Sequence, residues 1–325
     1  MKTIGIYHGE EDWVLKGIAQ DLSKSLIEIN RFKVKTTDRV FKSVRLDADY
    51  HLFVQQGQLN KNCRNNSDNV PKNSICLFTH LDIDNFRPEI LACCKAVIFN
   101  SSVQLSMAIA NGYNPSNAYL KPHAVDPRLH QILRKNDSEF QSILDKLKSN
   151  GKSLDYRSAV GFCGRYWEKY TYVRRKNYNK IKHVATSLAE SGIPVLIIGP
   201  GWHKLFTQRH PLITLVNAKY QLYPYFYNLM KIFVSLSVHE GGPLPILESM
   251  CCGAYPIVTN TGFAFDVLRD RNDGILVNAF RPSSYYVDIV KSHYFSENWD
   301  IFALRKRASE FSFLGLAGMI SDICE

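Results

Sequence analysis

The chain has 325 residues, of which 45% are hydrophobic and 12% aromatic, and this composition excludes a disordered or fibrous protein while allowing two domains with separate cores. Forty lysines and arginines against thirty aspartates and glutamates give a net charge of +10, and the window 164–183, with seven basic residues against the single Glu168, supplies six of these charges. The excess is local, which indicates a site rather than a generally basic surface.

The eight cysteines follow no paired metal-binding spacing, so we expect reduced, mostly buried thiols in a reducing compartment. The first apolar run, 4–7, is too short for a signal peptide, and no run reaches the length of a membrane span. We therefore expect a cytoplasmic protein, and peripheral attachment to a membrane surface stays open.

The first half of the chain alternates short apolar runs with polar or helical segments. Six runs are predicted as strands, at 4–7, 32–36, 50–54, 74–78, 96–99 and 118–120, and a helix is predicted over 13–29. This alternation predicts βαβ crossovers and a parallel sheet, in which ligands bind at the carboxyl ends of the strands. His8, His80 and His123 follow such ends, and for each a hydrogen-bonded loop residue is as good an interpretation as a functional one.

From residue 126 to 157 the composition is polar and charged, with a predicted helix over 140–147, and we place the domain linker there. The alternation then restarts. Strands are predicted at 159–163, 195–198, 213–216, 232–238 and 256–258, and helices at 177–190 and 223–230. Periodicity alone also permits a tandem Rossmann protein.

Two common ligand signatures are not favoured. No Gly-x-Gly-x-x-Gly follows the first strand, which argues against a dinucleotide site. The Asp-x-Asp pairs at 47–49 and 82–84 have no partner cluster, so we interpret them as solvated loop carboxylates rather than metal ligands.

The most informative stretch joins the strand at 232–238 to a helix that ends at Gly253, through the loop His-Glu-Gly-Gly-Pro at 239–243. Gly241 and Gly242 let backbone N–H groups approach a ligand at the helix N-terminus, which is the geometry of an anion site. A glycine-rich turn of this kind is also common in α/β proteins without any such role.

Two carboxylates bracket this loop. Glu240 precedes the turn, and Glu248 lies in the helix, roughly 7 Å along its axis from the start. Phosphates at the helix N-terminus would bring a ribose level with Glu248 and the far end of the ligand level with Glu240. A glutamate in a first helical turn is also often only a partner of the helix dipole.

The block 237–277 resembles the donor-binding half of the retaining GT-B glycosyltransferases of family four. That family carries a Glu-x7-Glu signature followed by a Gly-x-Pro-Ile-Val strand, and Glu240, Glu248, Gly253 and 256–258 fall on it, with one extra residue after the glycine. The chain departs from the family where Gly242 replaces a frequent phenylalanine and where Cys251-Cys252 replaces small residues.

The resemblance implies an α/β GT-B fold, with two doubly wound Rossmann-like domains facing a central cleft. Residues 1–155 would form the acceptor-side domain and 156–305 the nucleotide-sugar-binding domain. The last helical stretch begins at residue 300 and extends to at least 320, and its C-terminal part, at about 306–325, would cross back to the first domain.

The resemblance also assigns roles to residues. Glu240 and His80 would be catalytic, and the donor would be bound by Arg165, Lys176, Gly241, Gly242, Pro243, Leu244, Glu248 and Gly9. The family lysine follows Gly164-Arg165 at a shorter spacing than here, so counting back from the helix at 177–190 selects Lys176 and makes 170–175 an insertion. Lys169 and Arg175 are not excluded.

We expect a retaining hexosyl- or pentosyltransferase that uses a nucleoside-diphosphate sugar, without a metal or other cofactor, and acts on a glycan, lipid-linked or other acceptor. The basic and aromatic residues of 166–176 also fit a polyanionic acceptor, such as a phosphorylated glycan, an anionic lipid surface or modified DNA. A nucleotide-sugar epimerase and a non-catalytic nucleotide-sugar-binding subunit are the alternatives.

Overall fold

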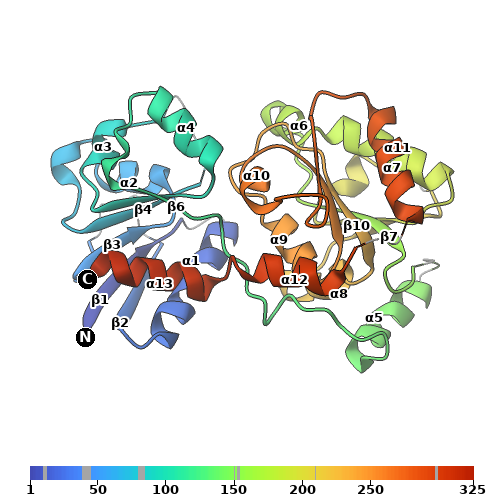
Figure 1. Cartoon of the computed structure of the whole chain (residues 1–325), viewed down its shortest axis with the longest axis horizontal. Helices are drawn as coiled ribbons and strands as arrows, with labels where there is room; N and C mark the ends of the chain where they lie inside the picture. The colour runs from blue at the N-terminus through green and yellow to red at the C-terminus, as the bar shows by residue number, and fades with distance from the viewer. Residues whose placement is uncertain are drawn as a thin grey trace. The chain divides into compact units, whose positions relative to one another are not determined.

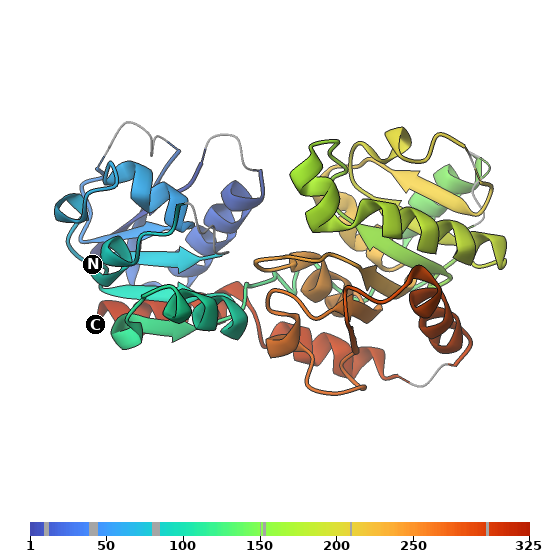
Figure 2. The same cartoon turned by 90° about the horizontal axis from the view of Figure 1, so that it is seen from above.

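The computed structural model describes residues 1–9, 13–38, 45–79, 85–149, 151, 154–208, 210–296 and 299–325. These residues form two six-stranded sheets, with the strand orders β2-β1-β3-β4-β5-β6 and β12-β11-β10-β7-β8-β9. Every strand pair is parallel. Helices cover both faces of each sheet (Figures 1 and 2), so the predicted pair of doubly wound Rossmann-like folds is confirmed.

The contacts divide the chain into unit 1, Met1–Ala124 with Phe311–Glu325, and unit 2, Val125–Glu310. Unit 1 has the strands β1 (Lys2–Tyr7), β2 (Phe32–Thr37), β3 (Tyr50–Phe53), β4 (Ser74–Phe78), β5 (Ala96–Phe99) and β6 (Ala118–Leu120). Its helices are α1 (Trp13–Glu28), α2 (Gln56–Asn62), α3 (Pro88–Ala92), α4 (Ser102–Ala110) and α13 (Phe313–Cys324). All six predicted strands of the first half are confirmed to within two residues at each end.

The core of unit 1 is built on its three central strands, β3, β4 and β5. They are buried along their whole length, as strands covered on both faces must be. Tyr7 stacks on Phe53 with ring centroids 4.5 Å apart, and Phe78 packs on Phe99 at 4.7 Å. On the other face α1 and α13 lie side by side (Figure 1).

Unit 2 has the strands β7 (Ala159–Cys163), β8 (Val195–Ile198), β9 (Ile213–Val216), β10 (Met230–Ser235), β11 (Tyr255–Thr259) and β12 (Ile275–Val277). Its helices are α5 (Ser138–Ser149), α6 (Tyr170–Lys176), α7 (Tyr178–Glu190), α8 (Tyr223–Tyr227), α9 (Leu244–Cys251), α10 (Ala264–Val267), α11 (Ser283–Phe295) and α12 (Ile301–Ser309). The segment 170–175, expected as an insertion without assigned structure, is therefore most of a short helix.

The division after Ala124 differs from the domain boundary predicted at residue 155. The polar segment that was interpreted as a linker is bonded to unit 2 through Asn228. The Asn228 side chain accepts from the Leu133 N–H (2.9 Å) and donates to the Gln131 carbonyl (2.8 Å). Polar composition cannot distinguish a solvated linker from a segment held by such bonds.

The helix expected within 300–320 is two helices. Asp300 caps α12 by accepting from the N–H of Phe302 (2.8 Å), and Ser312 caps α13 by accepting from the N–H of Gly315 (3.2 Å). Each cap starts a new helix, since it satisfies N–H groups that have no partner within the helix. α12 belongs to unit 2 and α13 to unit 1.

All eight cysteines are free and six are buried, as predicted. Burial raises the pKa of the Cys94 and Cys163 thiols to about 12, so these groups are inert apolar fillers rather than nucleophiles. None of the helices in the described ranges is long and apolar enough to cross a membrane.

Candidate active site

The loop between β10 and α9 follows a central strand of unit 2, at the sheet edge where ligands bind in parallel α/β folds. β10 ends at Ser235, three residues before the predicted end. The chain leaves the sheet there to bond the end of α6 and Asn177, the residue between α6 and α7. The Leu236 carbonyl accepts from the Asn177 amide (3.1 Å), and the Val238 N–H donates to the Arg175 carbonyl (2.8 Å).

The loop after β11 fixes the backbone of Glu240. The Glu240 N–H donates to the Thr261 hydroxyl at 2.9 Å. Next to it, Gly262 has a φ of +57°, and a Cβ there would lie 2.8 Å from the Gly241 carbonyl oxygen. The two loops therefore pack backbone on backbone, which only a glycine at 262 allows.

Two of the residues predicted to bind the donor here, Pro243 and Leu244, present no backbone N–H to a ligand. The Leu244 N–H donates to the Gly242 carbonyl (2.9 Å), and Pro243 has no N–H, so neither residue offers a donor to a ligand. Among the predicted donor-binding residues 241–244, the N–H groups that could donate to a phosphate are those of Gly241 and Gly242. Pro243 is the N-cap residue of α9, and Pro245 lies in the first turn, where its missing N–H costs no helical bond.

Glu240 and Lys176 form a largely buried ion pair. Lys176 Nζ lies 2.5 Å from Glu240 Oε1, and the two side chains are 29% and 9% exposed. Burial alone would raise the pKa of Glu240, but the charges of Lys176 and Arg175 outweigh it, and the pKa lies below its ordinary value. The site therefore holds an ionised carboxylate at neutral pH.

Lys176 reaches this position because it ends α6 immediately before a sharp change of direction. Asn177 follows it with φ +57° and ψ +41°, a left-handed conformation that asparagine tolerates, and α7 begins at Tyr178. Of the two candidate lysines, the structure brings Lys176 to Glu240. Lys169 is exposed at the other end of α6.

Arg165 lies in the loop after β7, where close backbone packing sets its place. Gly199 has a φ of +127°, and a Cβ there would come within 2.1 Å of the Gly164 carbonyl oxygen. The same oxygen accepts from the indole N–H of Trp202 at 2.6 Å. The exposed guanidinium of Arg165 lies over the Trp167 ring, 5.5 Å from its centroid.

Glu248 is 3% exposed on α9, and two tyrosines hold its carboxylate. Oε1 accepts from the Tyr220 hydroxyl and Oε2 from the Tyr227 hydroxyl, each at 2.6 Å. Sequence reasoning did not identify these tyrosines. The signal that would have found them is the run of four tyrosines in 220–227, directly before a buried strand at the binding edge.

The remaining candidates are in unit 1. Gly9 follows β1, and its N–H donates to the Gln58 side-chain oxygen (2.8 Å) when the Gln58 amide nitrogen donates to the Tyr7 carbonyl. His80 lies outside the residues that the structure describes. His8 and His123 are buried, and His8 contacts the Gly9 carbonyl through Nδ1 at 3.3 Å, as the loop interpretation predicted.

The first Asp-x-Asp pair is what the sequence predicted. Asp47 and Asp49 are exposed, Asp47 lies 3.5 Å from Lys35 Nζ, and Asp49 accepts from the Thr3 N–H at 2.7 Å. The pair at 82–84 lies outside the described residues. Within the described part of the chain no three His, Cys, Asp or Glu side chains are grouped as a metal site requires.

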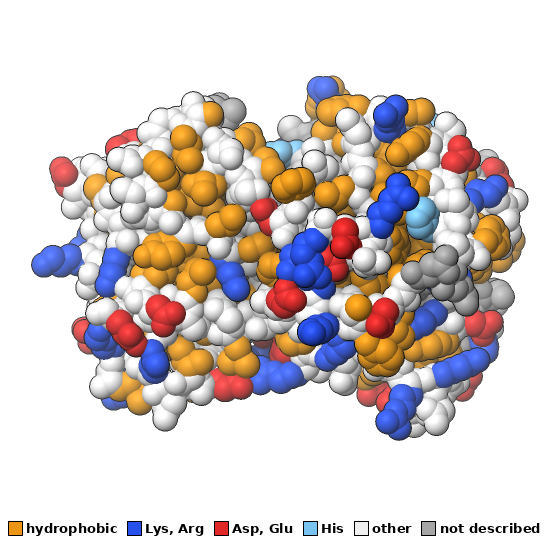
Figure 3. All heavy atoms as spheres, viewed as in Figure 1, with side chains coloured by type: hydrophobic (Ala, Val, Ile, Leu, Met, Phe, Trp, Pro, Cys, Tyr) orange, Lys and Arg blue, Asp and Glu red, His pale blue; other side chains and the backbone are white. Residues whose placement is uncertain are grey.

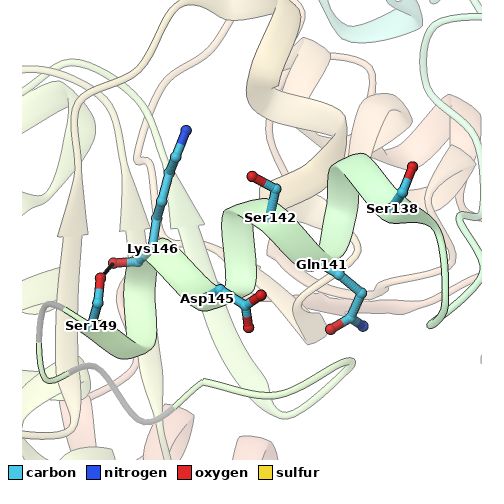
Figure 4. Close-up of a pocket in the computed structure, with 6 residues that line it drawn as sticks. All are labelled: Ser138, Gln141, Ser142, Asp145, Lys146 and Ser149. Carbon is cyan, nitrogen blue, oxygen red and sulfur yellow. Dashed lines mark hydrogen bonds between the residues drawn. The ribbon is translucent and has the colours of Figure 1, made fainter.

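A hollow of about 600 Å³ lies beside α5 (Figure 4). Its lining residues, Ser138, Gln141, Ser142, Asp145, Lys146 and Ser149, all belong to that one helix. Ser149 donates to the Lys146 carbonyl at 3.0 Å, which is local helix bonding. The hollow contains none of the predicted site residues, and we assign it no role in the site.

Comparison with known proteins gives the fold and the class of enzyme. Residues 170–289, which include Lys176, Glu240 and Glu248, match the family model described as glycosyl transferases group 1. No curated protein sequence matches the chain.

Solved structures match over the whole chain. HepE of Anabaena in complex with UDP and glucose is 14% identical, with 100% of this chain and 99% of that one covered and a TM-score of 0.70. Sucrose-phosphate synthase of Thermosynechococcus elongatus is 12% identical, with 100% and 98% covered and a TM-score of 0.74. The catalytic domain of starch synthase IV of Arabidopsis thaliana, bound to ADP and acarbose, is 11% identical, with 99% and 98% covered and a TM-score of 0.72. The chain thus has the GT-B fold, and the match of residues 170–289 to the glycosyl transferases group 1 model indicates a glycosyltransferase.

Proposed function

We propose that the chain is a retaining glycosyltransferase of the family-four type, which moves a sugar from a nucleoside-diphosphate sugar to an acceptor. The observation that carries the proposal is the buried Lys176–Glu240 pair. It keeps a carboxylate ionised beside a glycine loop at the carboxyl edge of a parallel sheet. The UDP and ADP in the related structures support a nucleotide sugar as donor.

Glu240 would act on the donor sugar. Cleavage of a sugar–phosphate bond gives the anomeric carbon oxocarbenium character, and a fixed negative charge close to it stabilises this state. The lowered pKa of Glu240 keeps that charge present at neutral pH.

The cations Lys176 and Arg165 would hold the diphosphate. An ammonium has three donors, so Lys176 keeps its bond to Glu240 while it donates to a phosphate oxygen. Negative charge grows on the diphosphate as it leaves, and one well-placed donor to such charge lowers the barrier by about 3 to 4 kcal/mol. The N–H groups of Gly241 and Gly242 would add to this.

In the proposed reaction, every bond that breaks and every bond that forms is accounted for without a further reactant. The bond between the anomeric carbon and the phosphate oxygen breaks, and a bond to the acceptor oxygen forms on the same face. The acceptor proton passes to the departing phosphate oxygen. In this proposal neither a metal nor another cofactor takes part, and Gly9 and His80 contribute from unit 1.

Glu248 would bind the ribose. Each of its two carboxylate oxygens accepts one tyrosine hydroxyl, and each has a further lone pair for a ribose hydroxyl. The buried, doubly bonded carboxylate is already oriented, so little conformational entropy is lost when the nucleotide binds.

The test is incubation of the protein with a panel of sugar nucleotides, with and without pooled glycan acceptors, followed by assay of free nucleoside diphosphate and NMR of the new anomeric linkage. Acceptor-stimulated release with an unchanged anomeric configuration supports the proposal. An epimerised sugar nucleotide would show the epimerase, and binding without turnover of any donor would show a non-catalytic subunit.

The acceptor would be a glycan or lipid-linked glycan, and we propose a cytoplasmic location, with peripheral membrane contact if the acceptor is lipid-linked. Support comes from the eight free cysteines, which suit a reducing compartment.

A further inference from the structure

One surface of unit 2, apart from its member Arg165, has no part in donor binding as proposed above. It consists of α6 and the loop before it, and we call it the α6 surface: Arg165, Trp167, Lys169, Tyr170, Tyr172 and Arg174. Trp167 and Tyr170 are 48% and 69% exposed, although large aromatic rings are usually covered. The α6 surface therefore combines exposed aromatic rings with exposed positive charge.

The rings and cations of this surface are ordered against one another. Arg165 lies over Trp167, whose ring stacks on Tyr172 with centroids 5.2 Å apart and planes at 23°. Arg175 lies over the other end of this stack, 5.0 Å from the Tyr172 centroid. The stack therefore runs from the loop after β7 to Arg175, the residue before the lysine that pairs with Glu240.

A second ordered pair lies further out on α6. Arg174 lies 5.6 Å from the Tyr170 ring centroid, one helical turn away, and contacts its hydroxyl at 3.4 Å. In the described part of the chain, no carboxylate forms an ion pair with Arg165, Lys169 or Arg174. The nearby Glu168 pairs with Lys204 instead, at 3.5 Å.

The extent of the surface limits what it can bind. The seven residues of α6 span only about 10 Å. Beyond α6, the Lys180 ammonium is engaged by the backbone and donates to the carbonyls of Ala279 (2.7 Å) and Arg281 (2.8 Å). On the face drawn in Figure 3, acidic and basic side chains are interspersed, without a broad field of one sign.

This short track disfavours nucleic acid, whose binding sites cover four or more nucleotides along a continuous basic groove. It also disfavours an anionic membrane, which attracts clusters of about four to eight basic residues. Exposed rings offer flat apolar faces to sugar rings, and guanidinium groups bind carboxylates and phosphates. The chemistry and the size both fit a short charged saccharide.

We propose that the α6 surface binds an acidic or phosphorylated sugar of the acceptor glycan, within one or two sugar residues of the hydroxyl that receives the new sugar. The inference rests on the proposed function, because it places an acceptor beside Glu240. Tyr170, which is 69% exposed, packs against a sugar ring, and Arg174 and Lys169 meet the negative charge, while Trp167 stays within its stack and borders the sugar with its exposed edge.

The experiment uses the full chain on immobilised oligosaccharides in matched neutral, carboxylated and phosphorylated forms. The test variant is Tyr170→Ala/Arg174→Ser. The matched control is Phe302→Ala/Lys306→Ser, which removes an exposed ring and an exposed cation at the same spacing on α12. The wild type and the control are expected to bind charged members at least tenfold better than neutral ones, and the test variant to lose about tenfold on the charged members alone.

Three results would overturn the inference: equal binding of charged and neutral members, equal loss in both variants, or tighter binding to a single-stranded DNA or to phosphatidylglycerol vesicles than to any glycan. Acceptor-free release of nucleoside diphosphate is measured in parallel. Normal release in the test variant together with lost glycan binding supports the α6 surface. If the wild type releases no nucleoside diphosphate from any sugar nucleotide, the proposed glycosyltransferase function is rejected instead.

Discussion

Removal of the Lys176 ammonium is expected to destabilise unit 2 at neutral pH. In Lys176→Met the aliphatic stem is kept and the partner of a buried carboxylate is lost. Breaking a fully buried pair costs about 3 to 5 kcal/mol, and an exposed pair is worth about 0 to 1. Since Lys176 is 29% exposed and Glu240 9%, we expect a loss of about 2 to 3 kcal/mol in the free energy of unfolding.

The loss should depend on pH in a defined direction. The folded pKa of Glu240 is below its unfolded value, so in the wild type Glu240 contributes stability above the unfolded pKa, and this is lost as the pH falls through the folded pKa. In Lys176→Met, burial is opposed only by the charge of Arg175 and the hydrogen bond from Ser237, and the pKa of Glu240 rises. On acidification Glu240 of the variant therefore binds a proton at a higher pH than in the wild type. The difference in free energy of unfolding between the variant and the wild type then becomes smaller towards acid pH.

Urea unfolding at pH 7 and pH 5, followed by tryptophan fluorescence, measures both effects. Lys169→Met is the control, because Lys169 is exposed at the start of α6, and we expect it to change stability by less than about 0.5 kcal/mol. If the two variants are equally stable at pH 7, or if the gap from the wild type is the same at both pH values, the ion pair does not have the role described here.

Three further predictions follow from the same site. Glu240→Gln should keep nucleoside diphosphate affinity and abolish transfer, whereas Glu248→Gln should weaken calorimetric binding of the diphosphate, and the reverse pattern would exchange their roles. Arg165→Ala should raise the barrier to transfer by about 3 kcal/mol, so that the rate falls roughly 100-fold while the free energy of unfolding is unchanged. A normal transfer rate would show that Arg165 does not bind the diphosphate. Gly199→Ala, with a φ of +127° and a Cβ 2.1 Å from the Gly164 oxygen, should cost about 2 kcal/mol or more in thermal unfolding, and unaltered stability would show that the loop relaxes.

The parts of the fold that depend on local pattern were predictable. Apolar runs gave the strands to within two residues in the first half, and Gly253 marked the end of α9, where its φ of +82° suits only glycine. The helical period of Ile181, Val184 and Leu188 also favoured Lys176 over Lys169, and the structure places Lys176 against Glu240.

Features that depend on contacts between distant segments were not predictable in this way. The tyrosines on Glu248 are 28 and 21 residues away in sequence, so no local spacing connects them. The early end of β10 follows from bonds made by Asn177 and Arg175, about sixty residues before it. His80 stays a prediction, as do the roles of Glu240 and Arg165 in catalysis.

The pairing of α13 with α1 has a consequence for how the protein is made. Unit 2 is one continuous segment, whereas unit 1 needs residues from both ends of the chain, with Lys2 Nζ donating to the Cys324 carbonyl at 2.7 Å. During synthesis unit 2 can therefore complete its core while unit 1 still lacks its last helix. A chain truncated after Glu310 should carry a protease-resistant 125–310 fragment next to an N-terminal segment that proteases still cut.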